Sequence, residues 1–262
     1  MLEVTSPKNP LIKEVRSLDR RKYRWGLKKF LVEGVKMVDE ALGNKDQAIK
    51  ILFTDSLTST DQGKNLFNKL AAMDNSVYLQ EELFRSISNM ENSQGVLATV
   101  GFTPKGIEHI PDEGILLYLD GLQDPGNLGT IIRSADAFGI SGLVLGDNCV
   151  DPYNPKVVRA TMGSIFRVPL YFQNNNEDFL LNLSAGRRIL ATSLDDASPL
   201  SDIIFSNRDV IVIGNEGHGV SPDILKLSDI RIVIPMVGNA ESLNAGVAAS
   251  IIMYETSRKL IK

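Results

Sequence analysis

The stretch DVIVIGNEGHG, residues 209–219, is the strongest indicator of fold in the carboxy-terminal half of the chain. Residues 210–213 are four consecutive apolar, β-branched residues, and three glycines follow within the next six positions. A strand that is apolar on both faces is typical of a parallel sheet covered by helices. Because ligands bind beyond the carboxyl ends of the strands in such sheets, GNEGHG is predicted to be a functional loop.

Further apolar runs of the same kind surround this stretch. They are separated by helical patterns and read ILLYLD (115–120), GLVLG (142–146), FRVPLYF (166–172), RRILATSL (187–194) and IRIVIPM (230–236). Strands of this composition form a mostly parallel sheet with helices on both faces. The fold class predicted for this half is therefore α/β.

The amino-terminal half predicts a second, smaller α/β domain. Its apolar runs are FLVEG (30–34), IKILFT (49–54), SVYLQ (76–80) and GVLATVG (95–101), and helical patterns cover 35–42, 66–73 and 82–87. The segment FTPKGIEHIPDEG (102–114) then interrupts both periodicities with prolines and glycines. We therefore predict one domain over residues 1–104 and another over residues 105–262.

Composition excludes several classes of protein. The chain has 262 residues, of which 43% are hydrophobic and 23% charged, as in ordinary globular proteins. No apolar run approaches the ~18 residues that a membrane span requires, and the start MLEVTSPKNP does not resemble a signal peptide. The single cysteine, Cys149, and two histidines give no zinc-binding set. We expect a cytoplasmic protein without a disulfide, a bound metal or a membrane partner.

The charge is distributed unevenly along the chain. Residues 1–104 carry a net charge of +2 and residues 105–262 a net charge of −6. Nine basic residues lie between Lys8 and Lys29, beside the aromatic Tyr23 and Trp25. This segment is either an arm that binds a polyanion or a solvated helix face. For an RNA-binding arm, the candidate residues are Lys13, Arg16, Arg20, Arg21, Lys22, Arg24, Lys28 and Lys29.

Two more loops follow predicted strands. The first, LDGLQDPGNLG (119–129), leads into a helix in which Asn127 is a plausible N-cap and Arg133 lies off the apolar face. The second, IPMVGNAESLN (234–244), precedes a helix that Ser242 can cap. Asn244 is a mediocre helix former, and its amide is well suited to orienting another polar group.

The loop after residue 213 is less easily interpreted. Glu216 is held among glycines that allow a close backbone approach to a ligand. The spacing of these glycines does not match a dinucleotide-binding fingerprint. We interpret His218 as a surface residue, because no partner carboxylate stands at a recognisable spacing.

Taken together, the three loops resemble a known family. DPGNLGTIIRSADAFG (124–139), IVIGNEGHGVS (211–221) and IPMVGNAESLNAGVAASI (234–251) are similar, in order and spacing, to the signature motifs of the SpoU (TrmH-type) RNA 2′-O-ribose methyltransferases. The segments FLVEGVKMVDEAL (30–42) and SQGVLA (93–98) resemble the substrate-binding domain of the members that modify rRNA. The resemblance implies S-adenosylmethionine as methyl donor, an RNA substrate with rRNA preferred over tRNA, a homodimer, and the knotted fold of the SPOUT methyltransferases.

The resemblance also assigns site residues. Motif matching gives the catalytic set Asn127, Arg133, Glu216, Ser242 and Asn244. It places the methyl donor against Thr192, Gly214, Glu216, Gly217, Ile234, Met236, Ser242 and Leu243. Since a guanidinium stays protonated, Arg133 is expected to clamp a phosphate or to stabilise a developing alkoxide rather than to abstract a proton. The small-residue face of Ala245, Gly246, Ala248 and Ala249 is the expected place for close dimer packing.

The sequence leaves other functions open. One alternative is a catalytically silent RNA-binding or assembly factor that keeps the fold, although the intact candidate residues argue against it. Another is a tRNA ribose methyltransferase or a base methyltransferase on the same scaffold. The sequence does not name the methylated nucleotide, nor whether free RNA or a ribosomal particle is the substrate.

Overall fold

A segment from the middle of the chain folds with the amino-terminal residues rather than with its neighbours in sequence. The computed structural model describes residues 2–43, 49–172 and 186–260. It forms two compact units, of which unit 1 comprises Met1–Thr103 with Tyr153–Phe166. Unit 2 comprises Pro104–Pro152 and Arg167–Lys262. Residues 153–166, which were expected in the second domain, thus pack in unit 1.

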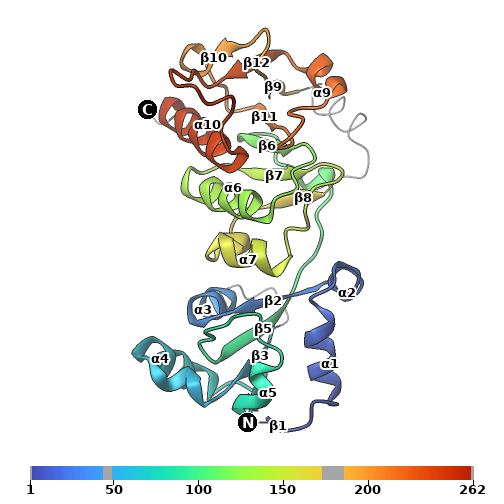
Figure 1. The fold of residues 1–262 in the computed structure, drawn as a ribbon, viewed down its shortest axis with the longest axis vertical. Coiled ribbons are helices and arrows are strands. Elements are labelled where there is room, and N and C mark those ends of the chain that lie inside the picture. The colour runs from blue at the N-terminus through green and yellow to red at the C-terminus, as the bar shows by residue number, and fades with distance from the viewer. Residues whose placement is uncertain (1, 44–48, 173–185, 261–262) are drawn as a thin grey trace. The chain divides into compact units, whose positions relative to one another are not determined.

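Unit 1 is built on a five-stranded mixed sheet with the order β1-β4-β3-β5-β2 (Figure 1). Its strands are β1 (Leu2–Val4), β2 (Lys29–Glu33), β3 (Ile49–Phe53), β4 (Ser76–Leu79) and β5 (Val96–Gly101). Its helices are α1 (Pro10–Ser17), α2 (Arg21–Leu27), α3 (Val35–Gly43), α4 (Asp61–Leu70), α5 (Glu81–Arg85) and α7 (Pro155–Thr161), with short 3₁₀ turns η1 (Asp55–Ser59) and η3 (Ser164–Phe166). The smaller α/β domain that was predicted for the amino-terminal half is therefore confirmed.

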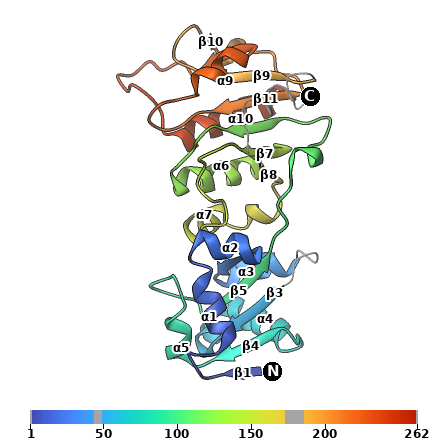
Figure 2. The same ribbon diagram turned by 90° about the vertical axis from the view of Figure 1, so that its right-hand side faces the viewer.

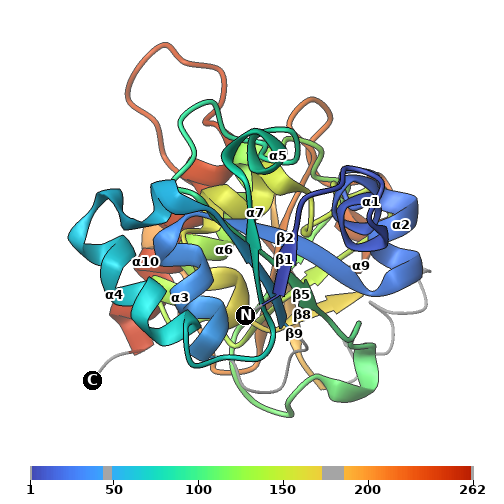
Figure 3. The same ribbon diagram turned by 90° about the horizontal axis from the view of Figure 1, so that it is seen from below.

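The basic segment near the amino terminus packs on this unit through an apolar face. In α1, Ile12 and Val15 are buried with Leu18 in one apolar cluster, which also contains residues of the sheet and of α5. Figures 1 and 3 show α1 and α2 on one side of the sheet and α3 and α4 on the other. The apolar spacing of α1 was hidden by the charges between its core positions.

The candidate RNA-binding residues therefore differ in what they can reach. The Arg24 side chain is only 2% exposed, and its Nη1 donates hydrogen bonds of 2.7 and 2.8 Å to the carbonyls of Leu18 and Asp19. The Nζ of Lys29 is 2.6 Å from the carboxylate of Glu14. Arg24 is thus a structural residue, because it satisfies carbonyls at the end of α1. The exposed members of the set are Lys13, Arg16, Arg20, Arg21, Lys22 and Lys28.

Unit 2 contains a seven-stranded sheet in which every adjacent pair is parallel. The order is β10-β12-β9-β11-β6-β7-β8. The strands are β6 (Leu116–Leu119), β7 (Gly142–Leu145), β8 (Leu170–Phe172), β9 (Arg188–Thr192), β10 (Ser198–Pro199), β11 (Asp209–Ile213) and β12 (Ile230–Val233). The described helices are α6 (Pro125–Ala137), α9 (Pro222–Leu227) and α10 (Ala245–Leu260), with the 3₁₀ turns η2 (Ile107–His109) and η4 (Leu200–Asp202).

Helices cover both faces of this sheet, so the predicted fold class is confirmed. Figures 1 and 2 show α9 on one face, and α6 beside α10 on the other. Tyr118, Val210 and Val212 are buried in the cluster that includes Ile224 of α9. Alternate residues such as Ile211 and Ile213 are equally buried and point to the opposite face. The knotted path of the chain stays a prediction.

The run FRVPLYF was expected to form one strand, and most of it does not. Only Leu170–Phe172 belongs to β8, while Ser164–Phe166 is a 3₁₀ turn in unit 1. The ring of Phe166 lies 6.2 Å from that of Phe30 in an aromatic cluster of that unit. Because the chain is still part of unit 1 at Phe166, β8 begins only at Leu170.

Replacing Arg24 should destabilise unit 1 because the carbonyls of Leu18 and Asp19 would lose their buried donor. We expect Arg24→Met to lower the free energy of unfolding by about 2–3 kcal/mol. The exposed neighbour Arg21→Met is the control and should change it by less than ~0.5 kcal/mol. The fluorescence of Trp25, the chain's single tryptophan, reports denaturant unfolding of this unit. An Arg24→Met variant with unchanged stability and weakened RNA binding would contradict the structural role.

Candidate functional site

A pocket of unit 2 lies beyond the carboxyl ends of β9, β11 and β12. These strands are neighbours in the sheet, in the order β12-β9-β11. Ligands bind in the crevice beyond the carboxyl ends of the strands in parallel sheets of this kind. The pocket has a volume of about 520 Å³, within the range of small-molecule sites.

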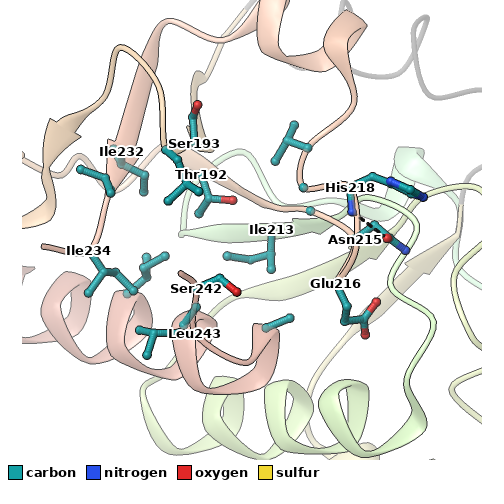
Figure 4. Close-up of a pocket in the computed structure, with 18 of the residues that line it drawn as sticks. Thr192, Ser193, Ile213, Asn215, Glu216, His218, Ile232, Ile234, Ser242 and Leu243 are labelled. Carbon is teal, nitrogen blue, oxygen red and sulfur yellow. Dashed lines mark hydrogen bonds between the residues drawn. The ribbon is translucent and has the colours of Figure 1, made fainter. Parts of the chain in front are cut away.

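Three segments supply the walls of this pocket: Thr192–Asp195 after β9, Ile213–Val220 after β11, and the chain from Ile232 into α10. Figure 4 shows Ile232 and Ile234 at one end and Glu216 at the other. The walls are thus apolar at one end and polar at the other. All eight residues that the sequence placed against a methyl donor line it: Thr192, Gly214, Glu216, Gly217, Ile234, Met236, Ser242 and Leu243.

Gly214 is required by a close approach of two backbone segments. A Cβ at this position would lie 2.1 Å from the carbonyl carbon of Gly219 and 2.2 Å from the nitrogen of Val220. Neither atom can move without breaking the turn, in which Asn215 and Gly219 exchange backbone hydrogen bonds of 2.9 Å. The turn that follows β11 is therefore closed tightly, and it places Glu216 at its tip.

The Glu216 carboxylate joins this turn to the loop after β6. Its Oε1 accepts hydrogen bonds from the backbone N of Asp124 (3.0 Å) and from Nδ2 of Asn127 (2.9 Å). Its Oε2 accepts one from the backbone N of Gln123 (3.2 Å). Three donors from one loop thus hold one carboxylate, and the two motifs are fixed relative to each other.

These contacts also decide the charge state of Glu216. Burial of the carboxyl raises its pKa, but the hydrogen bonds from Asn127, Asp124 and Gln123 lower it by more, so the net pKa lies below its usual value. Glu216 is therefore ionised at neutral pH and is a weak base. Its geometry suits the positioning of a loop better than the acceptance of a proton.

The helix α6 begins earlier than the sequence suggested. Asn127 was predicted as its N-cap, but the N-cap is Asp124, whose side chain accepts from the N of Asn127 (2.8 Å). Pro125 is the first helical residue, a position at which its fixed φ is favourable. Because Asn127 is inside the first turn, its amide is free to reach Glu216. An aspartate directly before a proline was the signal for this cap.

The capping prediction for the last helix was also wrong. Asn244, not Ser242, precedes α10, and its Oδ1 accepts from the N of Val247 (3.2 Å). Ser242 instead lines the pocket, where its hydroxyl is exposed (Figure 4). A Cβ on Gly246 would lie 3.2–3.3 Å from Asn244, Thr130 and Asn127. The two asparagines of the candidate site therefore approach each other where α6 meets α10.

Arg133 is exposed on α6, two turns beyond Asp124. Among the residues that the structure describes, none pairs with its guanidinium. A cation without a protein partner is available to an external anion. The structure does not place Arg133 in the wall of the pocket, whereas it brings together Asn127, Glu216, Ser242 and Asn244 around the loops after β6, β11 and β12.

The sequence did not single out Asn215, which shapes the turn. Its Nδ2 donates to the carbonyl of Gly121 (2.8 Å), and its Oδ1 accepts from the backbone N of Gly217 (2.9 Å) and His218 (3.2 Å). An asparagine that folds back on the following amides is a recognisable turn signal. His218 is exposed at the edge of the pocket, as interpreted.

Among the residues that the structure describes, no three His, Cys, Asp or Glu side chains gather in a group that could hold a metal ion. None of the helices in the described ranges is both long and apolar enough to cross a membrane.

Comparison with protein families finds two matches. The SpoU rRNA Methylase family matches residues 114–254, and the MRM3-like substrate binding domain matches residues 9–98. A relative from Bacillus subtilis (strain 168), the 23S rRNA (guanosine(2553)-2'-O)-methyltransferase RlmP, is 33% identical over 260 residues. The alignment covers 97% of this chain and 98% of the relative.

Solved structures share the fold over nearly the whole length. The AdoMet-bound rRNA methyltransferase from Sinorhizobium meliloti superposes with a TM-score of 0.86 at 33% identity, covering 99% of this chain and 98% of that one. The SpoU methyltransferase AviRb from Streptomyces viridochromogenes, in complex with AdoMet, gives a TM-score of 0.85 at 27% identity. That match covers 97% of this chain and 99% of the other.

The Glu216 contacts should protect two backbone amides from exchange with solvent. In Glu216→Gln, a side-chain NH₂ replaces one of the two acceptor oxygens, so either the backbone N of Gln123 or that of Asp124 loses its acceptor. We expect the exchange protection of at least one of these two amides to fall about tenfold, as measured by NMR. Glu241→Gln is the control, because Glu241 lines the same pocket and accepts no hydrogen bond from a described residue. Unchanged protection in Glu216→Gln would show that the contacts are not made in solution.

The same amides should respond to pH in a defined direction. Because the pKa of Glu216 is lower in the folded protein than its usual 4.5, its contribution is present above pH 4.5 and is lost as the pH falls through the lowered value. Protection factors of Gln123 and Asp124 should therefore stay constant from pH 7 to about pH 5 and decline below that. A decline centred near pH 6 would assign it to another group.

Proposed function

The chain belongs to the SpoU rRNA methylase family, and from this we propose that it transfers a methyl group from S-adenosylmethionine to a ribose 2′-hydroxyl of RNA, with rRNA as the substrate class. The observation that carries the proposal is the pocket beyond β9, β11 and β12, which the second and third sequence motifs line and to which the Glu216 carboxylate joins the first motif. The names of the relatives support the 2′-oxygen as acceptor and rRNA as substrate. A cytoplasmic location stays a prediction.

The pocket of unit 2 fits S-adenosylmethionine in size and in the chemistry of its walls. Ile232 and Ile234 offer apolar surface for an adenine ring, and Ser242 and Thr192 offer hydroxyls beside exposed backbone. When bound, S-adenosylmethionine supplies an electrophilic methyl group on a sulfonium sulfur. The family structures that contain AdoMet support this assignment.

Arg133 acts on the acceptor in this proposal. Its guanidinium is exposed and unpaired within the described structure, so it can bind an RNA phosphate or the oxygen on which negative charge develops. A guanidinium has N–H donors and no acceptor, so this side chain is not suited to take up a proton. Its contribution is therefore electrostatic and positional.

Glu216, Asn127 and Asn244 position the reacting groups. Glu216 uses its carboxylate to hold Gln123, Asp124 and Asn127, which fixes the start of α6 and thereby the helix that carries Arg133. Asn244 caps α10 beside Asn127 and Thr130. A misplacement of about 1 Å costs on the order of 10² in rate, so contacts that hold other residues of the site in place also matter to methyl transfer.

The protein acts as a homodimer in our proposal, through a face that differs from the one expected. Gly246 and Ala249 are buried, and Gly246 faces Thr130 of α6, so the small-residue face is used within the chain. Another side of α10 exposes an apolar stripe, which consists of Val247, Ile251 and Tyr254 at 46%, 37% and 54% exposure, with the Tyr254 ring edge-on to that of Phe138. A spacing of four and three residues places all three on one helix face. A second copy of this chain is the partner that covers them.

The direct test is transfer of labelled methyl from S-adenosylmethionine to RNA from cells that lack the protein. We expect labelled rRNA, resistance of one nucleotide linkage to alkali, and no transfer when the target carries a 2′-deoxyribose. Label in tRNA would correct the substrate class, and label on a base would correct the acceptor atom. RNA binding without any transfer would identify a catalytically silent factor.

Arg133→Lys should separate donor binding from methyl transfer. Lysine keeps the positive charge but loses the planar fork, so single-turnover methylation should fall on the order of 10² or more. Calorimetry should find the affinity for S-adenosylmethionine unchanged, because Arg133 does not line the pocket. Arg133→Ala should be at least as slow, and a near-normal rate in Arg133→Lys would show that a point charge suffices.

Ile251→Glu should dissociate the homodimer because it buries a charge in the apolar stripe. Light scattering at micromolar concentration should give twice 28.8 kDa for the wild type and 28.8 kDa for the variant. Ile204→Glu is the control, since Ile204 is 85% exposed elsewhere in unit 2. A monomeric wild type would contradict the dimer, and a dimeric Ile251→Glu would place the interface on another face.

A further inference from the structure

Helix α7 belongs by sequence to the methyltransferase segment and by structure to unit 1. The family match covers residues 114–254, which include Pro155–Thr161, yet α7 packs against β2 in unit 1. Tyr153, just before α7, stacks on Phe102 with ring centroids 3.8 Å apart. The substrate-binding unit is therefore completed by a helix that the catalytic segment supplies.

A shallow groove separates α7 from the loop Ser88–Ser93. Leu31 and Met37 are buried at its base, Met90 and Asn89 line one wall, and Val158 and Arg159 of α7 line the other. The groove is thus apolar at its base, with an amide on one rim and a guanidinium on the other. The groove holds about 30 Å³, so a ligand would lie across its mouth and contact the rims rather than fill it.

The loop wall is held in place before any ligand binds. The Glu33 carboxylate accepts hydrogen bonds from Oγ of Ser88, from the backbone N of Asn89 (3.0 Å) and from Oγ of Ser93 (2.8 Å). Nδ2 of Asn89 donates to Oδ1 of Asp19 (2.9 Å), at the turn between α1 and α2. Because this order already exists, a ligand loses little affinity to ordering the loop.

Glu33 and Asp19, near the groove, are used internally, whereas Glu91 and the nearby cations are exposed. Within the described structure, Glu33 and Asp19 accept the hydrogen bonds given above, and the loop's own Glu91 is exposed. Arg159 on one rim is exposed and has no partner among the described residues. Arg20 and Arg21, which follow Asp19 on the other side, are likewise exposed and unpaired.

We propose that this groove binds RNA, with Arg159 of α7 and the pair Arg20 and Arg21 contacting phosphates on either side of a nucleotide that rests against Met90. The inference rests on the proposed function, which supplies RNA as the substrate, and it adds the place of binding. RNA is favoured over an acidic protein segment because the groove has cations on either side of an apolar floor. This arrangement matches a nucleotide strand, in which phosphates alternate with nucleobases. With Arg159, the proposed RNA site contains residues from both family matches, 9–98 and 114–254.

Arg159→Gln should weaken binding of a protein-free transcript of large-subunit rRNA, with Lys156→Gln as the matched control. Both residues are exposed on α7, but only Arg159 lines the groove. We expect a loss of about five- to tenfold at physiological salt for Arg159→Gln, and a log-affinity versus log-salt slope lower by about 0.7–1. S-adenosylmethionine affinity should be unchanged. Equal effects of the two substitutions would overturn the groove as the site and leave only general charge attraction.

A photo-crosslinking side chain at Met90 tests contact rather than affinity. It should label the RNA transcript, whereas the same group at Met73, outside the groove, should not. Labelling of RNA at Met73 alone would overturn the proposal, as would a crosslink from Met90 to added ribosomal proteins but not to RNA. If the wild-type protein binds no RNA, the proposed function itself fails. If it binds RNA with no loss in Arg159→Gln, only the groove is wrong.

Discussion

The Glu216 carboxylate, held by two backbone amides and one side-chain amide, is the interaction on which the site of unit 2 depends. It joins the turn after β11 to the loop after β6, and both loops leave adjacent strands at the point where the strand order reverses. Gly214 makes this possible, since only a residue without a Cβ lets the turn close so tightly. The start of α6, and with it the helix that carries Arg133, follows from these few contacts.

The chain crosses between the two units three times, whereas a simple linker between independent domains crosses once. The chain passes from unit 1 to unit 2 after Thr103, returns at Tyr153 and leaves again after Phe166. Tyr153 and Phe166 both contribute rings to the aromatic cluster around Phe30. An excised segment 105–262 would lose the partners of α7 and would expose Val157 and Val158, which are buried in the intact chain.

Much of the fold of unit 2 could be predicted because its central strands are apolar on both faces. The runs 116–119 and 210–213 have no polar side to expose, so a covered parallel sheet is the arrangement that satisfies them. The helices α1 and α2 were less evident, because basic residues stand between core positions such as Ile12 and Val15. The burial of Arg24 could not be predicted either, since no local sequence feature distinguishes a buried arginine from an exposed one.

Local composition and spacing were enough to predict the α/β class, the three loops that form the site, and the family. The folded structure was needed to show that Asp124 and Asn244 are the caps, which leaves Asn127 able to bond to Glu216. It also placed α7 in unit 1 and turned Val247, Ile251 and Tyr254 outward. The physical reason is that these roles are contacts between residues far apart in sequence, and a pattern of neighbours along the chain does not say which distant group a side chain meets.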